Sequence, residues 1–224
     1  MKNLLQNILI VPDVINEQGL EALHRLIRSS SRHDLEVFDP TKANKTGKTE
    51  WTLDKQVRDT QHVDLSPVMP QISNLLTKLV GEVINPYYGF EIRDAEVPQL
   101  LCYGVGGHYH PHVDAEGVWV NPDGSKEWRK NIDRDLSVLI YLNEDYEGGE
   151  LVFPELHIRI RPKRGMLVAF PSTHHYLHGV EPVTSGERFA IVTWMTVKGY
   201  PTVDDINKQY EQRYATQVQG VYKL

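Results

Sequence analysis

The sequence contains very little cysteine: of its 224 residues, only Cys102 is one. An internal disulfide is therefore excluded, which fits a reducing compartment, and we expect Cys102 to be a small apolar strand residue. No stretch approaches the roughly 18 apolar residues of a membrane span. The apolar run 8–11 follows Gln6 and Asn7 and precedes Pro12, which is unlike a signal-peptide core. We therefore predict no membrane association and a cytoplasmic location.

The sequence also lacks an excess of positive charge, since its formal net charge is -6. Such a chain has no general attraction for nucleic-acid phosphates or anionic lipids, so a nucleic-acid demethylase is not expected. Hydrophobic residues make up 40% and charged residues 24%, close to the averages of soluble globular proteins. This length suits one domain, and we predict a single catalytic domain over residues 1–224.

Helical signals dominate the first 90 residues. Asn16 is a suitable N-cap for a first helix, and Ser66 followed by Pro67 marks the start of a second. Asn85-Pro86 should end this second helix. The apolar positions at helical spacing, which we expect to face a core, are Leu20, Leu23, Leu26 and Ile27 in the first helix and Val68, Ile72, Leu75, Leu76, Leu79, Val80 and Val83 in the second.

After about residue 91 the pattern changes to short β-like runs separated by turns. The predicted strands are Val97 to Tyr103, Leu136 to Leu142, Leu151 to Phe153, His157 to Ile160, Met166 to Phe170 and Arg188 to Val197. Helices followed by strands predict an α+β chain that is mainly β with flanking helices, namely a helix-backed antiparallel sandwich or jelly roll. Residues 1–90 would form a helix-rich support, 91–198 the jelly-roll core, and 199–224 a tail with one terminal helix.

The residues 103–114 hold the densest group of metal-binding side chains. Three histidines, His108, His110 and His112, lie close to Asp114. On an extended strand, His112 and Asp114 project to the same side, but parity alone does not choose among the three histidines. Only His112 has a carboxylate two residues later. Two histidines and one carboxylate would leave three positions open on a six-coordinate ferrous ion.

This segment resembles the prolyl 4-hydroxylase-like branch of the Fe(II)- and 2-oxoglutarate-dependent dioxygenases. The iron motif of that family, Tyr-x-x-Gly-x-x-Tyr-x-x-His-x-Asp, is reproduced by Tyr103, Gly106, Tyr109, His112 and Asp114. The matching order of residue types at fixed spacing makes this resemblance far more specific than a lone His-x-Asp pair.

Two further blocks strengthen the resemblance. His178 precedes Arg188 by ten residues, as the second iron histidine precedes a basic residue in the family. The residues 139–143 and 148–154 match the strand and Gly-Gly turn of the family. The resemblance extends over about 100–194, roughly the carboxy-terminal half, and implies a double-stranded β-helix, the cupin-like jelly roll of the superfamily.

The resemblance assigns roles to individual residues. Fe(II) would be held by His112, Asp114 and His178. Arg188 would bind the distal carboxylate of 2-oxoglutarate, because a guanidinium presents paired donors that match a carboxylate. Many collagen-type relatives have lysine at the position of Arg188, which weakens the inference to collagen-like substrates. Asp114 favours hydroxylation, since halogenating relatives have a small residue there.

Other aromatic residues are candidates for cosubstrate and substrate binding. Tyr103 and Tyr141 are alternative contacts for 2-oxoglutarate. The family resemblance places Tyr109 and Trp194 beside the substrate proline. Trp119 and Trp128 belong to an insert, residues 115–135, and are further substrate candidates.

Two polar segments could cover the site. The insert 115–135 is either a lid over the substrate or a solvated loop. The residues 39–62 predict an exposed loop or hairpin around Trp51, with the same two alternatives.

The expected reaction couples oxidative decarboxylation of 2-oxoglutarate by O₂, which yields succinate and CO₂, to hydroxylation of a C–H bond. The resemblance favours proline in a peptide or protein as the substrate, and it suggests ascorbate binding. A free amino acid or another small metabolite is the alternative substrate. A non-enzymatic jelly-roll module with a structural metal is the remaining alternative.

Overall fold

The largest element of the structure is an antiparallel sheet of eight strands. The computed structural model describes residues 7–38 and 51–221. The strand order is β1-β16-β12-β19-β8-β6-β2, and β7 also pairs with β19. The strands are β1 (Leu9–Val11), β2 (Arg32–Asp34), β6 (Gln61–Val63), β7 (Ile92–Ala95), β8 (Gln99–Tyr103), β12 (Leu136–Tyr141), β16 (Leu167–Pro171) and β19 (Arg188–Val197).

A second antiparallel sheet has five strands in the order β15-β14-β17-β9-β5. They are β5 (Arg58–Asp59), β9 (His108–His112), β14 (Leu151–Phe153), β15 (Ile158–Ile160) and β17 (His178–Val180). Between the two sheets lies an apolar core that includes Leu139, Leu151, Phe153 and Phe170. Two antiparallel sheets around a shared core form the predicted jelly roll.

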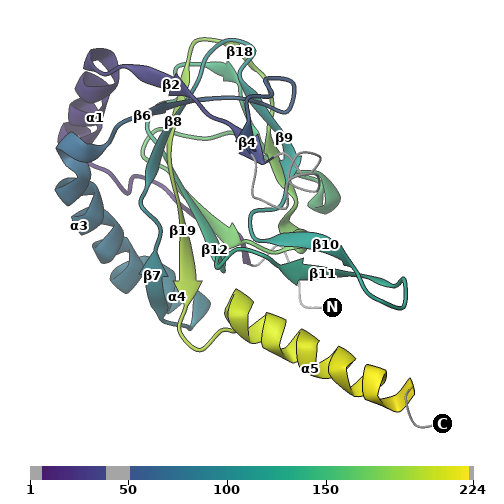
Figure 1. Ribbon diagram of the computed structural model, residues 1–224. Helices are drawn as coiled ribbons and strands as arrows, with labels where there is room; N and C mark the ends of the chain where they lie inside the picture. Colours follow the sequence, from purple (N-terminus) through teal and green to yellow (C-terminus); the bar gives the residue numbers. More distant parts are fainter. Residues whose placement is uncertain (1–6, 39–50, 222–224) are drawn as a thin grey trace.

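The outer face of the large sheet packs against helices (Figure 1). α1 (Glu17–Ser29) and α3 (Met69–Leu79) bury their apolar stripes in a second core. Val138 and Ile140 on β12 belong to this core, whereas Leu139 between them faces the other sheet, as the alternation of a strand requires. The first helix has the predicted cap, because the side chain of Asn16 accepts a hydrogen bond from the backbone N–H of Gly19.

Helical structure begins at Ser66 with Pro67 in its first turn, as predicted, but the cap role of Ser66 and the predicted end of the helix were wrong. Ser66 lies inside a 3-10 turn (Ser66–Val68), and the carboxylate of Asp64 accepts its backbone N–H at 2.9 Å. Asn85-Pro86 does not end the helix. A π-helical turn (Val80–Ile84) leads into α4 (Asn85–Tyr88), and the wider π turn alters the hydrogen-bond register before the proline. The helix ends at Gly89, which has a φ of 72°.

The residues 39–62 are only partly the exposed segment that the sequence predicts. β3 (Val37–Phe38) pairs with β4 (Trp51–Thr52) as a hairpin, and 39–50 between them fall outside the described residues. The residues 58–59 and 61–62, however, belong to β5, an edge strand of the small sheet, and to β6, which lies between β8 and β2 in the large sheet. These strands are too short to show a hydrophobic period in the sequence.

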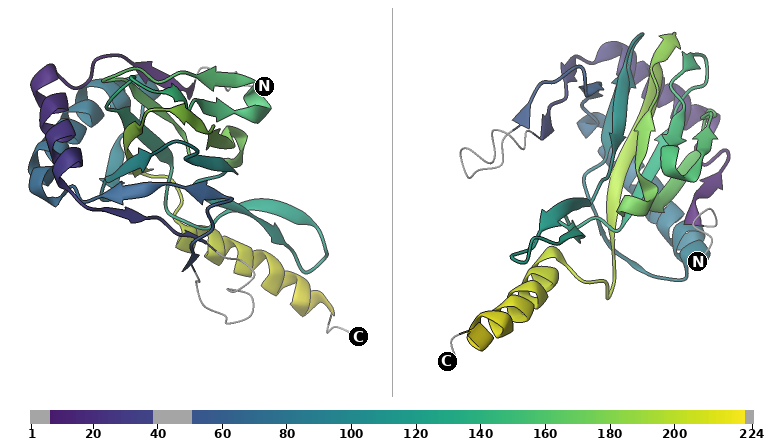
Figure 2. Two further views of the ribbon diagram at one scale, coloured as in Figure 1. Left: turned by 90° about the horizontal axis from the view of Figure 1, so that it is seen from above. Right: turned by 90° about the vertical axis from the view of Figure 1, so that its right-hand side faces the viewer.

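The insert 115–135 contains a long hairpin that the sequence left undefined. Its strands are β10 (Glu116–Val120) and β11 (Lys126–Lys130). The hairpin projects from the body beside the terminal helix α5 (Val203–Val221), as both views of Figure 2 show. Arg129 on β11 joins them, since its Nη2 donates to Asn207 Oδ1 on α5 at 3.0 Å.

The remaining elements are short. A two-stranded ribbon pairs β13 (Glu147–Gly148) with β18 (Val183–Ser185). The 3-10 turns η4 (Pro154–Leu156) and η5 (His174–Tyr176) follow β14 and precede β17. In the described part of the chain, no helix is both long enough and apolar enough to cross a membrane. The single-domain organisation over 1–224 stays a prediction.

Candidate active site

The structure brings His112, Asp114 and His178 together. His112 is the last residue of β9, and His178 is the first of the neighbouring strand β17, directly opposite it. One possible ligand atom from each of the three residues lies within 4.8 Å of the other two. His112 Nε2 is 3.6 Å from Asp114 Oδ1, and His178 Nε2 is 3.4 Å from Asp114 Oδ2. The three side chains thus surround a space the size of a metal ion.

The backbone orients both imidazoles. Nδ1 of His112 donates to the carbonyl oxygen of His110 at 2.9 Å, and Nδ1 of His178 donates to that of Tyr176 at 3.0 Å. With Nδ1 protonated, the lone pair of each ring is on Nε2, which faces Asp114. Burial lowers the pKa of His178 to about 4, so that its ring is neutral near pH 7.

Asp114 is buried and held as a carboxylate. Burial alone opposes its ionisation, but His178 and His112 lower the pKa of Asp114 well below its usual range. Ser137 Oγ donates to Asp114 Oδ2 at 2.6 Å and lies 2.8 Å from Ser172 Oγ. Strand β9 ends at His112, so Asp114 reaches the site from the following bend and not from a continuous strand. A carboxylate and two neutral imidazoles are a donor set that suits Fe(II).

The structure distinguishes His112 from the other two histidines of the segment. Both ring nitrogens of His108 face backbone carbonyl oxygens, Nδ1 that of Gly106 at 2.8 Å and Nε2 that of Gln56 at 3.0 Å. His110 is exposed. Neither belongs to the group of possible ligand atoms around Asp114.

Arg188 lies in a buried pocket of tyrosines next to this group. It begins β19, is 1% exposed, and its guanidinium carbon is 4.8 Å from the ring centre of Tyr103 and 4.9 Å from that of Tyr141. The structure therefore places both predicted tyrosines beside Arg188. Tyr146, which the sequence analysis did not single out, contributes a third phenol.

Four polar atoms of this pocket have no hydrogen-bond partner among the described residues. They are Arg188 Nε, Arg188 Nη2, Tyr141 Oη and Tyr146 Oη. Buried polar groups are nearly always paired in folded proteins, so unpaired donors around one cation indicate space for an anion. These residues therefore fit a bound carboxylate, as 2-oxoglutarate would provide.

The predicted substrate residues lie in two places. The ring of Tyr109 stacks on that of His112 at 3.7 Å. Trp194 lies under the guanidinium of Arg134 at 3.6 Å, and Arg134 Nη1 is 3.5 Å from the carbonyl oxygen of Asp114. Both aromatic residues are thus tied to metal-site residues, Tyr109 directly and Trp194 through Arg134.

Trp119 and Trp128 are both on the hairpin β10-β11. Trp128 stacks on His174 of η5, with ring centres 5.0 Å apart, and Arg129 covers Trp119 at 4.5 Å. Glu116 of the same hairpin accepts hydrogen bonds from the backbone N–H of His174 and from its ring. The hairpin is therefore attached to the turn that leads to His178.

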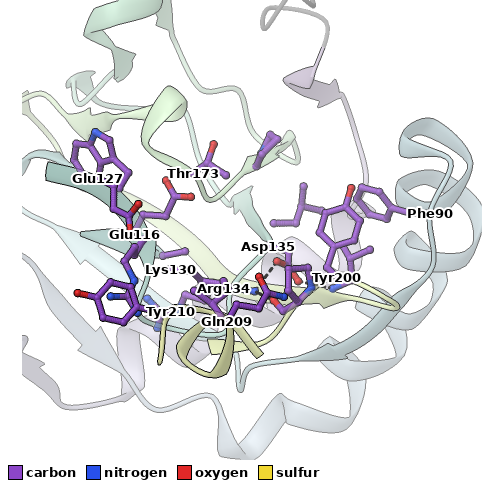
Figure 3. A pocket seen from close by; sticks show the side chains of 18 of the residues that line it. Phe90, Glu116, Glu127, Lys130, Arg134, Asp135, Thr173, Tyr200, Gln209 and Tyr210 are labelled. Carbon is purple, nitrogen blue, oxygen red and sulfur yellow. Dashed lines mark hydrogen bonds and ion pairs between the residues drawn. The ribbon is translucent and has the colours of Figure 1, made fainter. Parts of the chain in front are cut away.

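A separate cavity of about 390 Å³ lies between the hairpin and α5 (Figure 3). Charged side chains in its lining are paired. Lys130 Nζ is 2.7 Å from Asp135 Oδ1, and Arg213 Nη1 is 3.3 Å from Glu127 Oε2. None of the buried unpaired polar atoms of the described residues belongs to the lining of this cavity, in contrast to the Arg188 pocket.

Known proteins resemble the jelly-roll part of this chain in sequence. Residues 98–196 match the model of the 2OG-Fe(II) oxygenase superfamily. The chain is 32% identical over 117 residues to prolyl 3-hydroxylase 2 of Rattus norvegicus, covering 49% of this chain but only 16% of that protein. It is 32% identical over 153 residues to a putative prolyl 4-hydroxylase of Acanthamoeba polyphaga mimivirus, covering 63% of this chain and 59% of the relative. The chain thus spans about one sixth of the first relative and less than two thirds of the second.

Solved structures share the fold. A viral collagen prolyl hydroxylase from Paramecium Bursaria Chlorella virus-1 superposes with a TM-score of 0.54 at 19% identity, covering 84% of this chain and 95% of that one. A prolyl hydroxylase from Trichoplax adhaerens, solved with a hypoxia inducible factor peptide fragment, gives 0.57 at 18% identity, covering 85% and 84%. The predicted double-stranded β-helix is confirmed. Residues 98–196 thus match the 2OG-Fe(II) oxygenase superfamily, and prolyl hydroxylases are among the proteins similar to this chain, in agreement with the resemblance that its iron motif and the order of its blocks indicate.

Proposed function

We propose that this chain is an Fe(II)- and 2-oxoglutarate-dependent dioxygenase that hydroxylates proline in a peptide or protein and releases succinate and CO₂. The observation that carries the proposal is the convergence of two imidazoles and one carboxylate beside a buried arginine with unpaired donors. The named activity of its relatives, prolyl hydroxylation, supports the choice of substrate. An entirely structural metal site would have no need for the Arg188 pocket.

His112, Asp114 and His178 would hold the iron, and their three ligand atoms leave further coordination positions free. The bound iron, with O₂ and 2-oxoglutarate, supplies the oxidising chemistry. Arg188 would anchor the distal carboxylate of 2-oxoglutarate, with Tyr141 and Tyr103 as further cosubstrate contacts. The buried position of this pocket excludes water, which strengthens the charge-assisted hydrogen bonds.

Substrate proline would be oriented by Tyr109 and Trp194, because an apolar ring packs well against aromatic faces. The hairpin with Trp119 and Trp128 would contact residues flanking the proline. Its attachment to η5 supports this role, since the same turn leads to His178. The Trichoplax relative with its bound peptide supports a peptide over a free amino acid. Ascorbate binding and the cytoplasmic location stay predictions from the sequence.

Mass spectrometry tests the proposal. The purified chain is incubated aerobically with Fe(II), 2-oxoglutarate and a library of proline-containing peptides, with free proline in a parallel reaction. We expect a gain of one oxygen atom on a peptide and a matching amount of succinate. Hydroxylation of free proline alone would move the substrate to the small-molecule class. If 2-oxoglutarate neither binds nor yields succinate, the proposed function is wrong.

A further inference from the structure

Tyr146 is a buried tyrosine whose hydroxyl has no partner among the described residues, although the residue is only 6% exposed. It shares this condition with Tyr141 Oη and with two guanidinium nitrogens of Arg188. A phenol that only filled a core would be expected to bond a nearby carbonyl oxygen, as Tyr88 does with those of Asn7 at 2.8 Å and Ala169 at 2.9 Å.

The backbone around Tyr146 fixes it next to Arg188. Asn143, three residues earlier, donates to the carbonyl oxygen of Glu187 at 2.7 Å and accepts from the backbone N–H of Phe189 at 2.9 Å. The segment before Tyr146 is therefore bound to both chain neighbours of Arg188. These bonds hold the segment that leads to Tyr146 against the start of β19.

Gly149 allows the close approach of the two side chains. A Cβ atom at this position would lie 3.0 Å from Arg188 Cδ and 3.2 Å from Tyr146 Cε2, so a larger residue would crowd both side chains and force them to shift. The backbone of Gly149 also has a φ of 66°, which favours glycine. The Gly-Gly turn that resembles the family therefore also makes room for the contact between Tyr146 and Arg188.

The charge state of the phenol makes it a donor. Burial raises the pKa of Tyr146, and the nearby Arg188 only partly offsets this effect. The hydroxyl is therefore protonated at neutral pH. A carboxylate has two oxygens and about four lone-pair positions, which matches the four unpaired atoms of the pocket.

We propose that Tyr146 is a further cosubstrate-binding residue, whose hydroxyl donates to the distal carboxylate of 2-oxoglutarate together with Arg188 and Tyr141. It thereby selects 2-oxo acids that carry this second carboxylate. The inference rests on the proposed function and adds a residue of this chain to its cosubstrate pocket.

The test uses the full chain, anaerobic Mn(II) in place of Fe(II), and two ligands, 2-oxoglutarate and pyruvate. Pyruvate has the 2-oxo acid group but no distal carboxylate. Dissociation constants are measured by calorimetry for the wild type, Tyr146→Phe, Tyr141→Phe and the remote control Tyr88→Phe. Tyr146→Phe should raise the dissociation constant of 2-oxoglutarate about ten- to a hundredfold, as expected for the loss of one hydrogen bond to a charged group. The dissociation constant of pyruvate should stay unchanged.

Thermal unfolding of the metal-free protein supplies a second readout. Tyr146→Phe removes a hydroxyl that has no partner, so its unfolding midpoint should stay the same or rise. Tyr88→Phe removes bonds between the hydroxyl and the backbone, so its midpoint should fall while its affinity for 2-oxoglutarate stays the same.

The outcomes separate the inference from the function on which it rests. If the wild type binds 2-oxoglutarate and Tyr146→Phe binds it equally well, the role of Tyr146 is wrong and the proposed function stands. Equal weakening of both ligands would also overturn the inference, because it would indicate a general disturbance of the pocket. If the wild type does not bind 2-oxoglutarate, the proposed function fails and the inference with it.

Discussion

The surroundings of Arg134 and of Arg188, called here the Arg134 side and the Arg188 side, differ in how the charge of the arginine is matched. Arg134 makes two hydrogen bonds to the carboxylate of Glu96, one at 2.8 Å, and stacks on Trp194. Arg188 is more deeply buried, yet its Nε and Nη2 have no partner among the described residues. A satisfied arginine stabilises the protein as it stands, whereas an unsatisfied one is stabilised by a ligand. Replacing the arginine by glutamine should therefore affect the stability of the protein on the Arg134 side and the affinity for 2-oxoglutarate on the Arg188 side.

The largest effect is expected at Asp114, whose carboxylate lies between the two histidines of the candidate metal site. Asp114→Ala removes one of three predicted ligands, and even residues that only support metal ligands contribute about ten- to a hundredfold, so we expect a loss of turnover above a hundredfold. Mn(II) should raise the unfolding midpoint of the wild type but not of this variant. Asp204→Ala, an exposed acid at the start of α5, is the control and should behave as the wild type. Full turnover by Asp114→Ala would refute its role as a ligand.

Arg188→Gln sharpens the comparison on the cosubstrate side. The dissociation constant of 2-oxoglutarate should rise by about a hundredfold or more, because a buried charged contact is lost. The metal-free variant should be at least as stable as the wild type, since Arg188 has unpaired buried nitrogens without the ligand. Calorimetry and thermal unfolding measure both. An unchanged affinity would show that Arg188 does not bind the distal carboxylate of 2-oxoglutarate.

Arg134→Gln should give the opposite result. Loss of the paired contacts with Glu96 should lower the free energy of unfolding by about 1 kcal/mol, a modest value because the pair is partly exposed. The affinity for 2-oxoglutarate should not change. Chemical denaturation measures the free energy of unfolding, and calorimetry on the same preparation measures the affinity for 2-oxoglutarate. If Arg134→Gln weakened the binding of 2-oxoglutarate as much as Arg188→Gln does, the Arg134 side and the Arg188 side would not differ in their role in cosubstrate binding.

The smallest effect is expected on the hairpin. Trp128→Ala removes the stack on His174 and should raise the KM for a peptide substrate about two- to tenfold, the usual value of one aromatic pair. The KM for 2-oxoglutarate should stay constant. Steady-state kinetics with either substrate varied checks this. An equal change in both KM values would argue against a substrate role.

Local pattern predicted the jelly-roll core well, because its strands are buried and bounded by turns. β14 and β19 have the predicted limits, and the N-cap at Asn16 is confirmed. The sequence could not predict what depends on neighbours. Pro86 continues a helix because a π turn precedes it, and β5 and β6 are strands because they pair with β9 and with β8 and β2, which lie far from them in the sequence.

The candidate site shows the same division. The spacing of the iron motif and the family resemblance singled out His112, Asp114, His178 and Arg188. The structure brings the first three together and buries the fourth between Tyr103 and Tyr141. Tyr146 was missed because it lies in a connection without periodicity. A large aromatic residue between a core strand and a Gly-Gly turn was the one available signal, and only the fold shows that its hydroxyl is buried without a partner.

The single cysteine makes this protein convenient for spectroscopy. Cys102 is 1% exposed, and burial raises the pKa of its thiol to about 12, so that it should react very slowly with maleimides in the native state. A thiol introduced at the exposed turn of the β10-β11 hairpin, as in Asp123→Cys, could then be labelled selectively without first removing the native one. A fluorophore there would report directly whether the hairpin moves when a peptide binds.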